Sequence, residues 1–121
     1  MHKTILTVDD SRAMRDMLRH SLMAAGFRVL QAEDGLQGLE MLETEIPDVI
    51  VTDINMPRMD GFGFIEALRG HESRRAVPVL VLTTEVDVEK KQRAREVGAT
   101  GWIVKPFDPV KLVEAIRRVS A

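Results

Sequence analysis

The 121-residue sequence has no cysteine, which excludes disulfides, thiol redox chemistry and metal sites held by thiolates. Its three histidines, His2, His20 and His71, are scattered without the spacing of metal ligands. No apolar run approaches the ~20 residues that a membrane-spanning helix needs, and no charged-then-apolar leader is present. From these absences we expect a cytoplasmic protein that does not bind a membrane.

The chain also lacks a large excess of charge of either sign. It has 17 Lys and Arg residues and 19 Asp and Glu residues, which leave a net charge of −2. This balance provides no general electrostatic attraction for nucleic acid, so we expect no nucleic-acid partner. The hydrophobic fraction of 45% and the charged fraction of 30% are typical of a folded globular chain. The length fits one domain over residues 1–121.

Short β-branched runs alternate with segments of helical periodicity along the whole chain. The predicted strands are residues 3–8, 27–31, 48–52, 77–82 and 101–104. The second helix places Leu36, Leu39 and Leu42 on one face. The fourth helix is mostly charged, and its positions suited to burial are Val88, Ala94 and Val97. Five strands alternating with five helices predict an α/β fold, with a parallel sheet and helices on both faces.

Polar residues stand where four of the predicted strands end. They are Asp9, Asp10, Asp53, Thr83 and Lys105. The carboxyl ends of parallel strands meet at one edge of an open sheet, where the loops leave a crevice for a ligand. Asp53 there can be a nucleophile, a metal ligand or a helix cap, and Asp9 or Asp10 can also be a cap. Taken together at one edge, the five side chains favour a functional site.

Three carboxylates in one crevice repel one another, and a bound cation relieves this repulsion. Oxygen ligands without histidine or thiolate select a hard ion, and Mg²⁺ is the usual one where a phosphoryl group completes its shell. The ammonium of Lys105 and the hydroxyl of Thr83 are groups that stabilise a phosphoryl group from its other side. With Asp53 as nucleophile, this set of residues predicts phosphoryl transfer to an aspartate.

At these residues the sequence resembles the receiver domains of two-component response regulators, most closely the single-domain, CheY-like regulators of chemotaxis. The resemblance covers essentially the whole chain, and four motifs in the family's order and spacing carry it. These are Val8-Asp9-Asp10-Ser11, Asp53-Ile54-Asn55-Met56-Pro57 with Asp60-Gly61, Thr83, and Lys105-Pro106-Phe107. The resemblance implies the flavodoxin/CheY-like fold, a doubly wound five-stranded parallel sheet in the order 2-1-3-4-5.

The resemblance also implies a chemical role for each matched residue. Asp53 would be the phosphoacceptor, receiving its phosphoryl group from the phosphohistidine of a CheA-like sensor histidine kinase. Asp10, Asp53 and the backbone carbonyl of Asn55 would bind Mg²⁺ directly, and Asp9 would act mostly through water. Lys105 would bridge to the phosphoryl group, and its peptide bond to the following proline is typically cis in this family.

Two further pairs of residues concern the signal itself. Thr83 is the switch hydroxyl of the family, and its movement toward the phosphoryl group vacates space for an aromatic residue, which is Trp102 here. Most CheY-like proteins have tyrosine at that place, so two readings of Trp102 stay open: a rotamer switch or an aromatic residue at a sheet edge. Asn55 and Glu85 occupy positions that tune how fast water removes the phosphoryl group, and their pairing suggests a short-lived signal.

The function implied is a stand-alone, monomeric signalling receiver that catalyses its own phosphoryl acceptance and autodephosphorylation. Its expected target is a flagellar motor switch protein. The alternative is a phosphate sink or relay that exchanges phosphoryl groups with a histidine phosphotransfer protein. A dehalogenase-type phosphatase would need a general acid where the chain has Asn55. A flavodoxin-like carrier would need a loop that holds a flavin phosphate, which Asp9 and Asp10 would repel.

Overall fold

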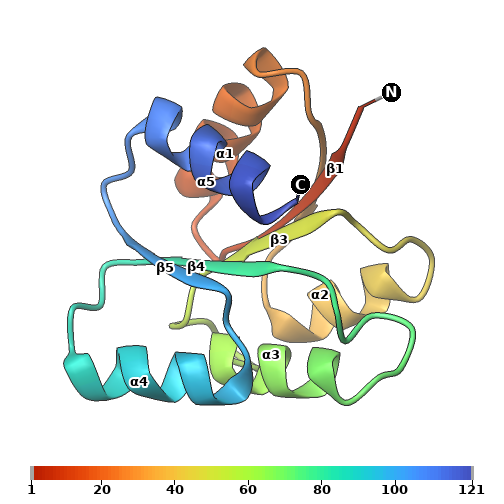
Figure 1. Cartoon of the computed structure of the whole chain (residues 1–121), viewed down its shortest axis with the longest axis vertical. Helices are drawn as coiled ribbons and strands as arrows, with labels where there is room; N and C mark the ends of the chain where they lie inside the picture. The colour runs from red at the N-terminus through yellow and green to blue at the C-terminus, as the bar shows by residue number, and fades with distance from the viewer. Residues whose placement is uncertain (1, 121) are drawn as a thin grey trace.

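The computed structural model describes residues 2–120 as a parallel sheet between two layers of helices (Figure 1). The elements in chain order are β1 (Thr4–Val8), α1 (Arg12–Ala24), β2 (Arg28–Ala32), α2 (Gly35–Leu42), β3 (Val49–Thr52), α3 (Gly61–Arg69), β4 (Val79–Thr83), α4 (Val88–Val97), β5 (Gly101–Val104) and α5 (Pro109–Val119). The strand order is β2-β1-β3-β4-β5, with every neighbouring pair parallel. The predicted α/β fold and the strand order implied by the resemblance are confirmed.

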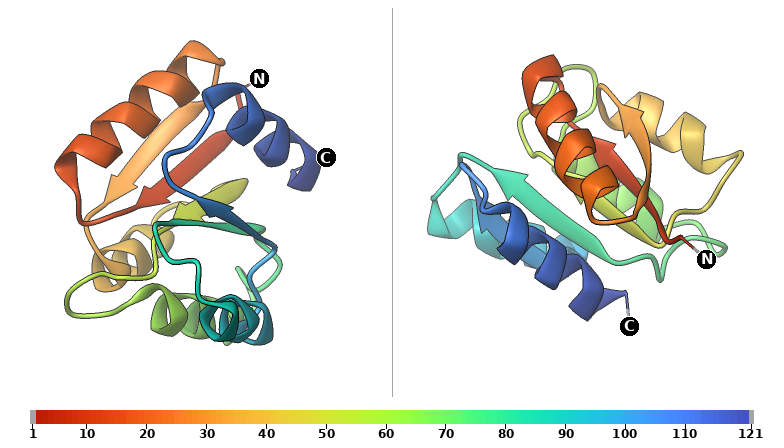
Figure 2. Two further views of the ribbon diagram at one scale, coloured as in Figure 1. Left: turned by 90° about the vertical axis from the view of Figure 1, so that its left-hand side faces the viewer. Right: turned by 90° about the horizontal axis from the view of Figure 1, so that it is seen from above.

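Each face of the sheet has its own hydrophobic core. Helices α1 and α5 cover one face, and α2, α3 and α4 cover the other (Figures 1 and 2). The α1/α5 side is centred on Leu18, Leu22, Leu112 and Ile116. The opposite side is centred on Phe62, Phe64, Ile65 and Leu68. Strands β1, β3 and β4 are buried along their whole length, which explains why their sequences are nearly continuous apolar runs.

A polar cap begins each of the five helices within residues 2–120. The caps are Ser11, Asp34, Asp60, Asp87 and Asp108, and each side chain accepts a hydrogen bond from a backbone N–H in the first turn. These bonds satisfy N–H groups that have no partner inside the helix. Because each helix begins shortly after a strand ends, the caps also fix the loops at the carboxyl edge of the sheet.

Helix α2 buries only part of the face that its leucines predict, because Leu42 is buried and Leu39 packs partly against the core. Leu36, predicted to share a buried face, is exposed, whereas Gly35 and Gly38 are buried. A Cβ atom at position 38 would lie 2.8 Å from Cε1 of Phe64. The helix therefore approaches α3 closely at Gly38, because only a residue without a side chain fits there.

Helix α4 is lightly anchored. Of its described residues, only Ala94 is buried, and Val97 packs partly against the core. The guanidinium carbon of Arg93 lies 4.2 Å from the centroid of the Phe62 ring and adds a contact to α3. Val88, predicted to be buried, is 79% exposed, because it begins a helix that contacts the core only through its second half.

Strand β4 begins two residues later than the sequence pattern predicts. Val77 donates its N–H to the Arg74 carbonyl in a turn, and Pro78 has no N–H to contribute to a ladder. The other predicted strands agree with the structure to within one residue at each end.

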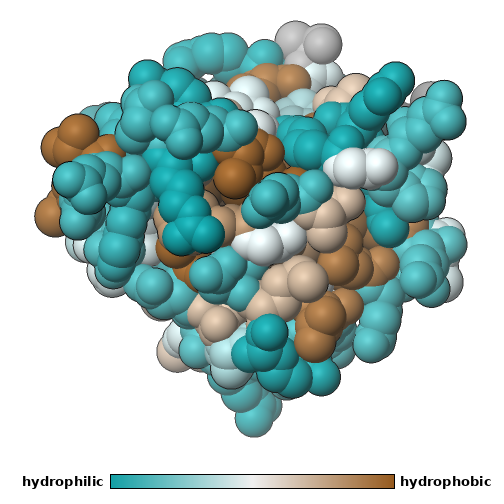
Figure 3. All heavy atoms as spheres, turned by 90° about the horizontal axis from the view of Figure 1, so that it is seen from below, coloured by the Kyte–Doolittle hydropathy of each residue, from teal (hydrophilic) through white to brown (hydrophobic). Residues whose placement is uncertain are grey.

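The surface over α3 and α4 is mostly hydrophilic. Seen from below, this side of the molecule shows hydrophobic residues only in separate patches between polar ones (Figure 3).

No helix within residues 2–120 is both long enough and apolar enough to cross a membrane.

Arg69, at the end of α3, joins three segments through its guanidinium group. Nε and Nη2 donate to the Gly98 carbonyl at 3.1 and 2.7 Å, and Nη1 donates to the carbonyls of Arg75 and Val77 at 2.8 and 2.6 Å. Burial lowers the pKa of Arg69, and within residues 2–120 no carboxylate pairs with it. The side chain therefore holds the ends of α3 and α4 to the segment before β4.

We expect Arg69→Met to lower the free energy of unfolding by about 1.5–3 kcal/mol, the usual contribution of hydrogen bonds made by a charged group. Arg75→Met is the matched control, because it removes an exposed arginine from the neighbouring loop. It should change stability by less than about 0.5 kcal/mol. Urea unfolding measures both values. Equal losses in the two variants would contradict the role of Arg69.

Candidate functional site

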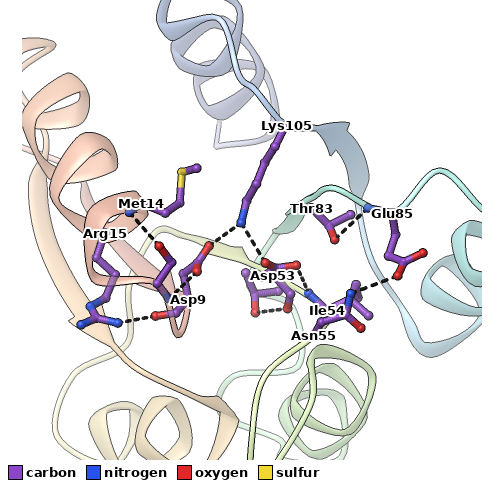
Figure 4. A network of polar contacts seen from close by, with 11 residues as sticks. Asp9, Met14, Arg15, Asp53, Ile54, Asn55, Thr83, Glu85 and Lys105 are labelled. Carbon is purple, nitrogen blue, oxygen red and sulfur yellow. Dashed lines mark hydrogen bonds and ion pairs between the residues drawn. The ribbon is translucent and has the colours of Figure 1, made fainter.

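The structure brings the candidate site residues together at the carboxyl edge of the sheet (Figure 4). Asp9 and Asp53 directly follow β1 and β3, Thr83 is the last residue of β4, and Lys105 directly follows β5. Strands β1 and β3 are neighbours in the sheet, so the two aspartates lie side by side. Lys105 reaches them from the loop beyond β5.

Asp9, Asp10 and Asp53 form an acidic cluster. One carboxylate oxygen of each lies within 4.8 Å of those of the other two. Asp9 and Asp53 are buried, and Asp10 is exposed. A set of converging carboxylate oxygens without nitrogen or sulfur ligands fits a hard divalent cation such as Mg²⁺.

Lys105 neutralises part of this cluster. Its Nζ lies 2.9 Å from Oδ2 of Asp9 and 2.8 Å from Oδ2 of Asp53, and its side chain is only 11% exposed. Burial raises the pKa of Asp9, although the N–H of Ser11 and the ammonium of Lys105 oppose this shift. Burial alone would lower the pKa of Lys105, but its two carboxylate partners outweigh burial and raise it. The lysine therefore stays charged. The Lys105–Pro106 peptide bond is cis.

Two contacts fix the loop that carries Asp9. Its Oδ1 accepts a hydrogen bond from the Ser11 N–H at 2.9 Å, and its backbone carbonyl accepts one from Nη1 of Arg15 at 2.6 Å. The role of Arg15 could not be predicted, because its place in α1 does not reveal that its side chain turns back to the preceding loop. The contact holds the backbone of Asp9 against α1.

Gly61 allows α3 to begin directly beside Asp53. A Cβ atom at position 61 would clash with the carbonyl oxygen of Asp53, and the Gly61 N–H donates to the Ile54 carbonyl at 2.8 Å. Ile54 donates its own N–H to Oδ1 of Asp53 at 2.6 Å, which leaves Oδ2 facing Lys105. The Asp60-Gly61 pair thus combines a helix cap with a close approach to the backbone of Asp53.

A side-chain bridge connects the loops after β3 and β4. Oε1 of Glu85 accepts a hydrogen bond from Nδ2 of Asn55 at 3.1 Å and lies 3.1 Å from Nζ of Lys90. The hydrogen bonds from Lys90 and Asn55 hold the pKa of Glu85 below its usual value. Oγ1 of Thr83, which is fully buried, accepts a hydrogen bond from the Glu85 N–H at 3.3 Å. The Lys90 contact was not predicted from the sequence.

Trp102 lies on the edge strand β5, paired with Val81 of β4. The indole is partly buried and packs against the core on the α2–α4 side of the sheet. It lines a cavity of about 70 Å³ together with Ala94 of α4. Trp102 is therefore placed between the end of the sheet and the lightly anchored helix.

Comparison with known sequences agrees with this geometry. Residues 5–117 match the family model of the response regulator receiver domain. Response regulator MprA of Mycobacterium tuberculosis is 38% identical over 117 residues, covering 97% of this chain and 50% of that protein. The chain thus spans about half the length, or less, of the curated relatives it matches.

Comparison with solved structures gives the same result. The chemotaxis response regulator CheY4 of Vibrio cholerae has a TM-score of 0.92 and 44% identity, covering 98% of this chain and 99% of that one. The receiver domain of sensor histidine kinase PA1611 from Pseudomonas aeruginosa, solved with magnesium in its active site cleft, has a TM-score of 0.92 and 26% identity, covering 99% and 98% of the two chains. The chain belongs to the response regulator receiver domain family of two-component systems and has a CheY-like structure.

Proposed function

We propose that this receiver is switched by phosphorylation of Asp53. The observation that carries the proposal is the position of the Asp53 carboxylate, with Oδ2 2.8 Å from Nζ of Lys105 in a cluster with Asp9 and Asp10. A buried carboxylate held between an ammonium group and a cation-binding cluster suits a phosphoryl acceptor, because charge on the incoming group is offset from two sides.

The reaction proposed is a phosphoryl transfer in which a carboxylate oxygen of Asp53 is the nucleophile. It attacks the phosphorus of a phosphohistidine on the kinase, and the phosphorus–nitrogen bond breaks with its electron pair returning to the imidazole. Lys105 offsets charge on the phosphoryl oxygens, and the Thr83 hydroxyl donates a hydrogen bond to one of them. Attack by water later restores the carboxylate and releases inorganic phosphate.

Magnesium would be held by Asp10, Asp53 and the backbone carbonyl of Asn55, with Asp9 acting through water. When bound, the ion supplies positive charge to the phosphoryl oxygens. Receiver domains bind Mg²⁺ at an acidic pocket, and the converging oxygens of the three aspartates support the same site here. The magnesium in the cleft of the PA1611 receiver supports the assignment further.

The proposed partners are a CheA-like sensor histidine kinase as donor and a flagellar motor switch protein as target. Receiver domains interact with histidine kinases and with downstream targets, and the similarity to the chemotaxis regulator CheY4 favours this pathway. The target would bind the face formed by α4, β5 and α5. The receiver would act as a monomer in the cytoplasm. Similarity to the receiver of a sensor kinase favours, as a second candidate, a relay with a histidine phosphotransfer protein.

We expect acetyl phosphate with Mg²⁺ to add one phosphoryl group to the wild-type protein and none to Asp53→Asn, because the amide is not a nucleophile of this kind. Chelation of Mg²⁺ should prevent the adduct. Asp48→Asn is the matched control, since Asp48 precedes the same strand at its opposite end. Intact-protein mass spectrometry reads the result. An unmodified wild type, or an adduct on Asp53→Asn, would refute the proposal.

We also expect phosphorylation to change the emission of Trp102, the only tryptophan in the chain, because movement of Thr83 alters the space beside β5. In the Thr83→Ala variant, phosphorylation to the same extent, as measured by intact mass, should leave the emission of Trp102 unchanged. Fluorescence spectra of both proteins before and after addition of the donor test this. Identical changes in the two proteins would show that Trp102 does not respond to Thr83.

A further inference from the structure

One carboxylate oxygen links α4 to the two loops beside Asp53. Oε1 of Glu85 accepts a hydrogen bond from Nδ2 of Asn55 at 3.1 Å and forms an ion pair with Nζ of Lys90 at 3.1 Å. Asn55 and Glu85 meet on the opposite side of Asp53 from Asp9 in the view of Figure 4. Lys90 lies in the first turn of α4, so the bridge is anchored on a helix.

The ion pair has the properties of a positioning contact. The Glu85 side chain is 25% exposed and that of Lys90 43%, so the pair is partly shielded from water. Within residues 2–120, Glu85 is the one acidic partner of Lys90, and the neighbouring Lys91 forms no ion pair. Without Lys90, the Glu85 carboxylate would keep only a neutral amide as its side-chain partner. It would then turn readily toward water.

The bridge is also tied to the switch residue. Oγ1 of Thr83 accepts a hydrogen bond from the Glu85 N–H at 3.3 Å. If Thr83 turns toward a phosphoryl group on Asp53, as in the proposed function, the Glu85 N–H loses this acceptor. The position of the Glu85 side chain then depends on its contacts with Asn55 and Lys90.

We infer that Lys90 is a positioning residue that holds Glu85 across the approach to Asp53 and thereby prolongs the life of the aspartyl phosphate. This inference rests on the proposed phosphorylation of Asp53. In the hydrolysis, a water oxygen forms a bond to phosphorus as the bond between phosphorus and the Asp53 oxygen breaks. Asp53 regains its carboxylate, and the protons of the water leave with the phosphate and the solvent. The bridge slows the entry of that water.

The test measures how fast the phosphoryl group is lost. Wild type, Lys90→Met, Lys90→Gln and Lys90→Arg are phosphorylated with acetyl phosphate and Mg²⁺, the donor is removed, and the adduct is followed by intact mass. Both neutral variants should lose the group about two- to fivefold faster, the range that an ion pair of this kind supplies. Lys90→Arg should restore the wild-type rate, and Lys91→Met, which removes the same charge one residue away, should leave it unchanged.

The same substitution made in the Glu85→Ala variant separates positioning of Glu85 from a general effect of charge. Because Lys90 acts only through Glu85, adding Lys90→Met to Glu85→Ala should produce no further change in the rate. Unchanged decay in both neutral variants would overturn the inference, as would equal acceleration by Lys91→Met or by Lys90→Met in the Glu85→Ala background. A wild-type protein that takes no phosphoryl group would overturn the proposed function as well, so the two failures are distinguishable.

Discussion

The two ion pairs of Lys105 are the contacts on which the rest of the site depends. The strand order places β1 beside β3 and thereby brings Asp9 and Asp53 together in a buried place. Carboxylates buried without compensation cost several kcal/mol each, so this convergence needs a positive charge. Lys105 supplies it from the loop after β5, at 2.9 and 2.8 Å. The chain can therefore assemble an acidic cluster without losing the packing of its central strands.

The same arrangement connects the site to the surface. Thr83 and Glu85 share a hydrogen bond, and Glu85 in turn joins Asn55 to Lys90 on α4. Helix α4 has a single buried residue among those described, so it resists displacement less than the other helices. Side-chain contacts thus join the carboxyl edge of the sheet to the helix that has the fewest buried residues. The Arg69 contacts hold only the far end of that helix.

The sequence predicted most of the fold because its strands are nearly continuous apolar runs that end in polar residues. It also predicted which side chains meet at the sheet edge, since parallel strands share one carboxyl end. Periodicity failed for Leu36 and Val88, because it identifies one face of a helix but not the neighbour that covers it. The contacts of Arg15 and Lys90 were missed for another reason. Their contacts depend on the reach of long side chains to backbone or loop groups, which spacing along the chain does not encode.

The most direct test of the central claim is the affinity for Mg²⁺, measured by isothermal titration calorimetry at low ionic strength on wild type and Lys105→Met. If the lysine balances the charge of the carboxylates, its removal leaves a more negative cluster, and the variant should bind Mg²⁺ several-fold more tightly. Lys91→Met should bind as the wild type does. Equal or weaker binding by Lys105→Met would show that Lys105 does not provide this balance.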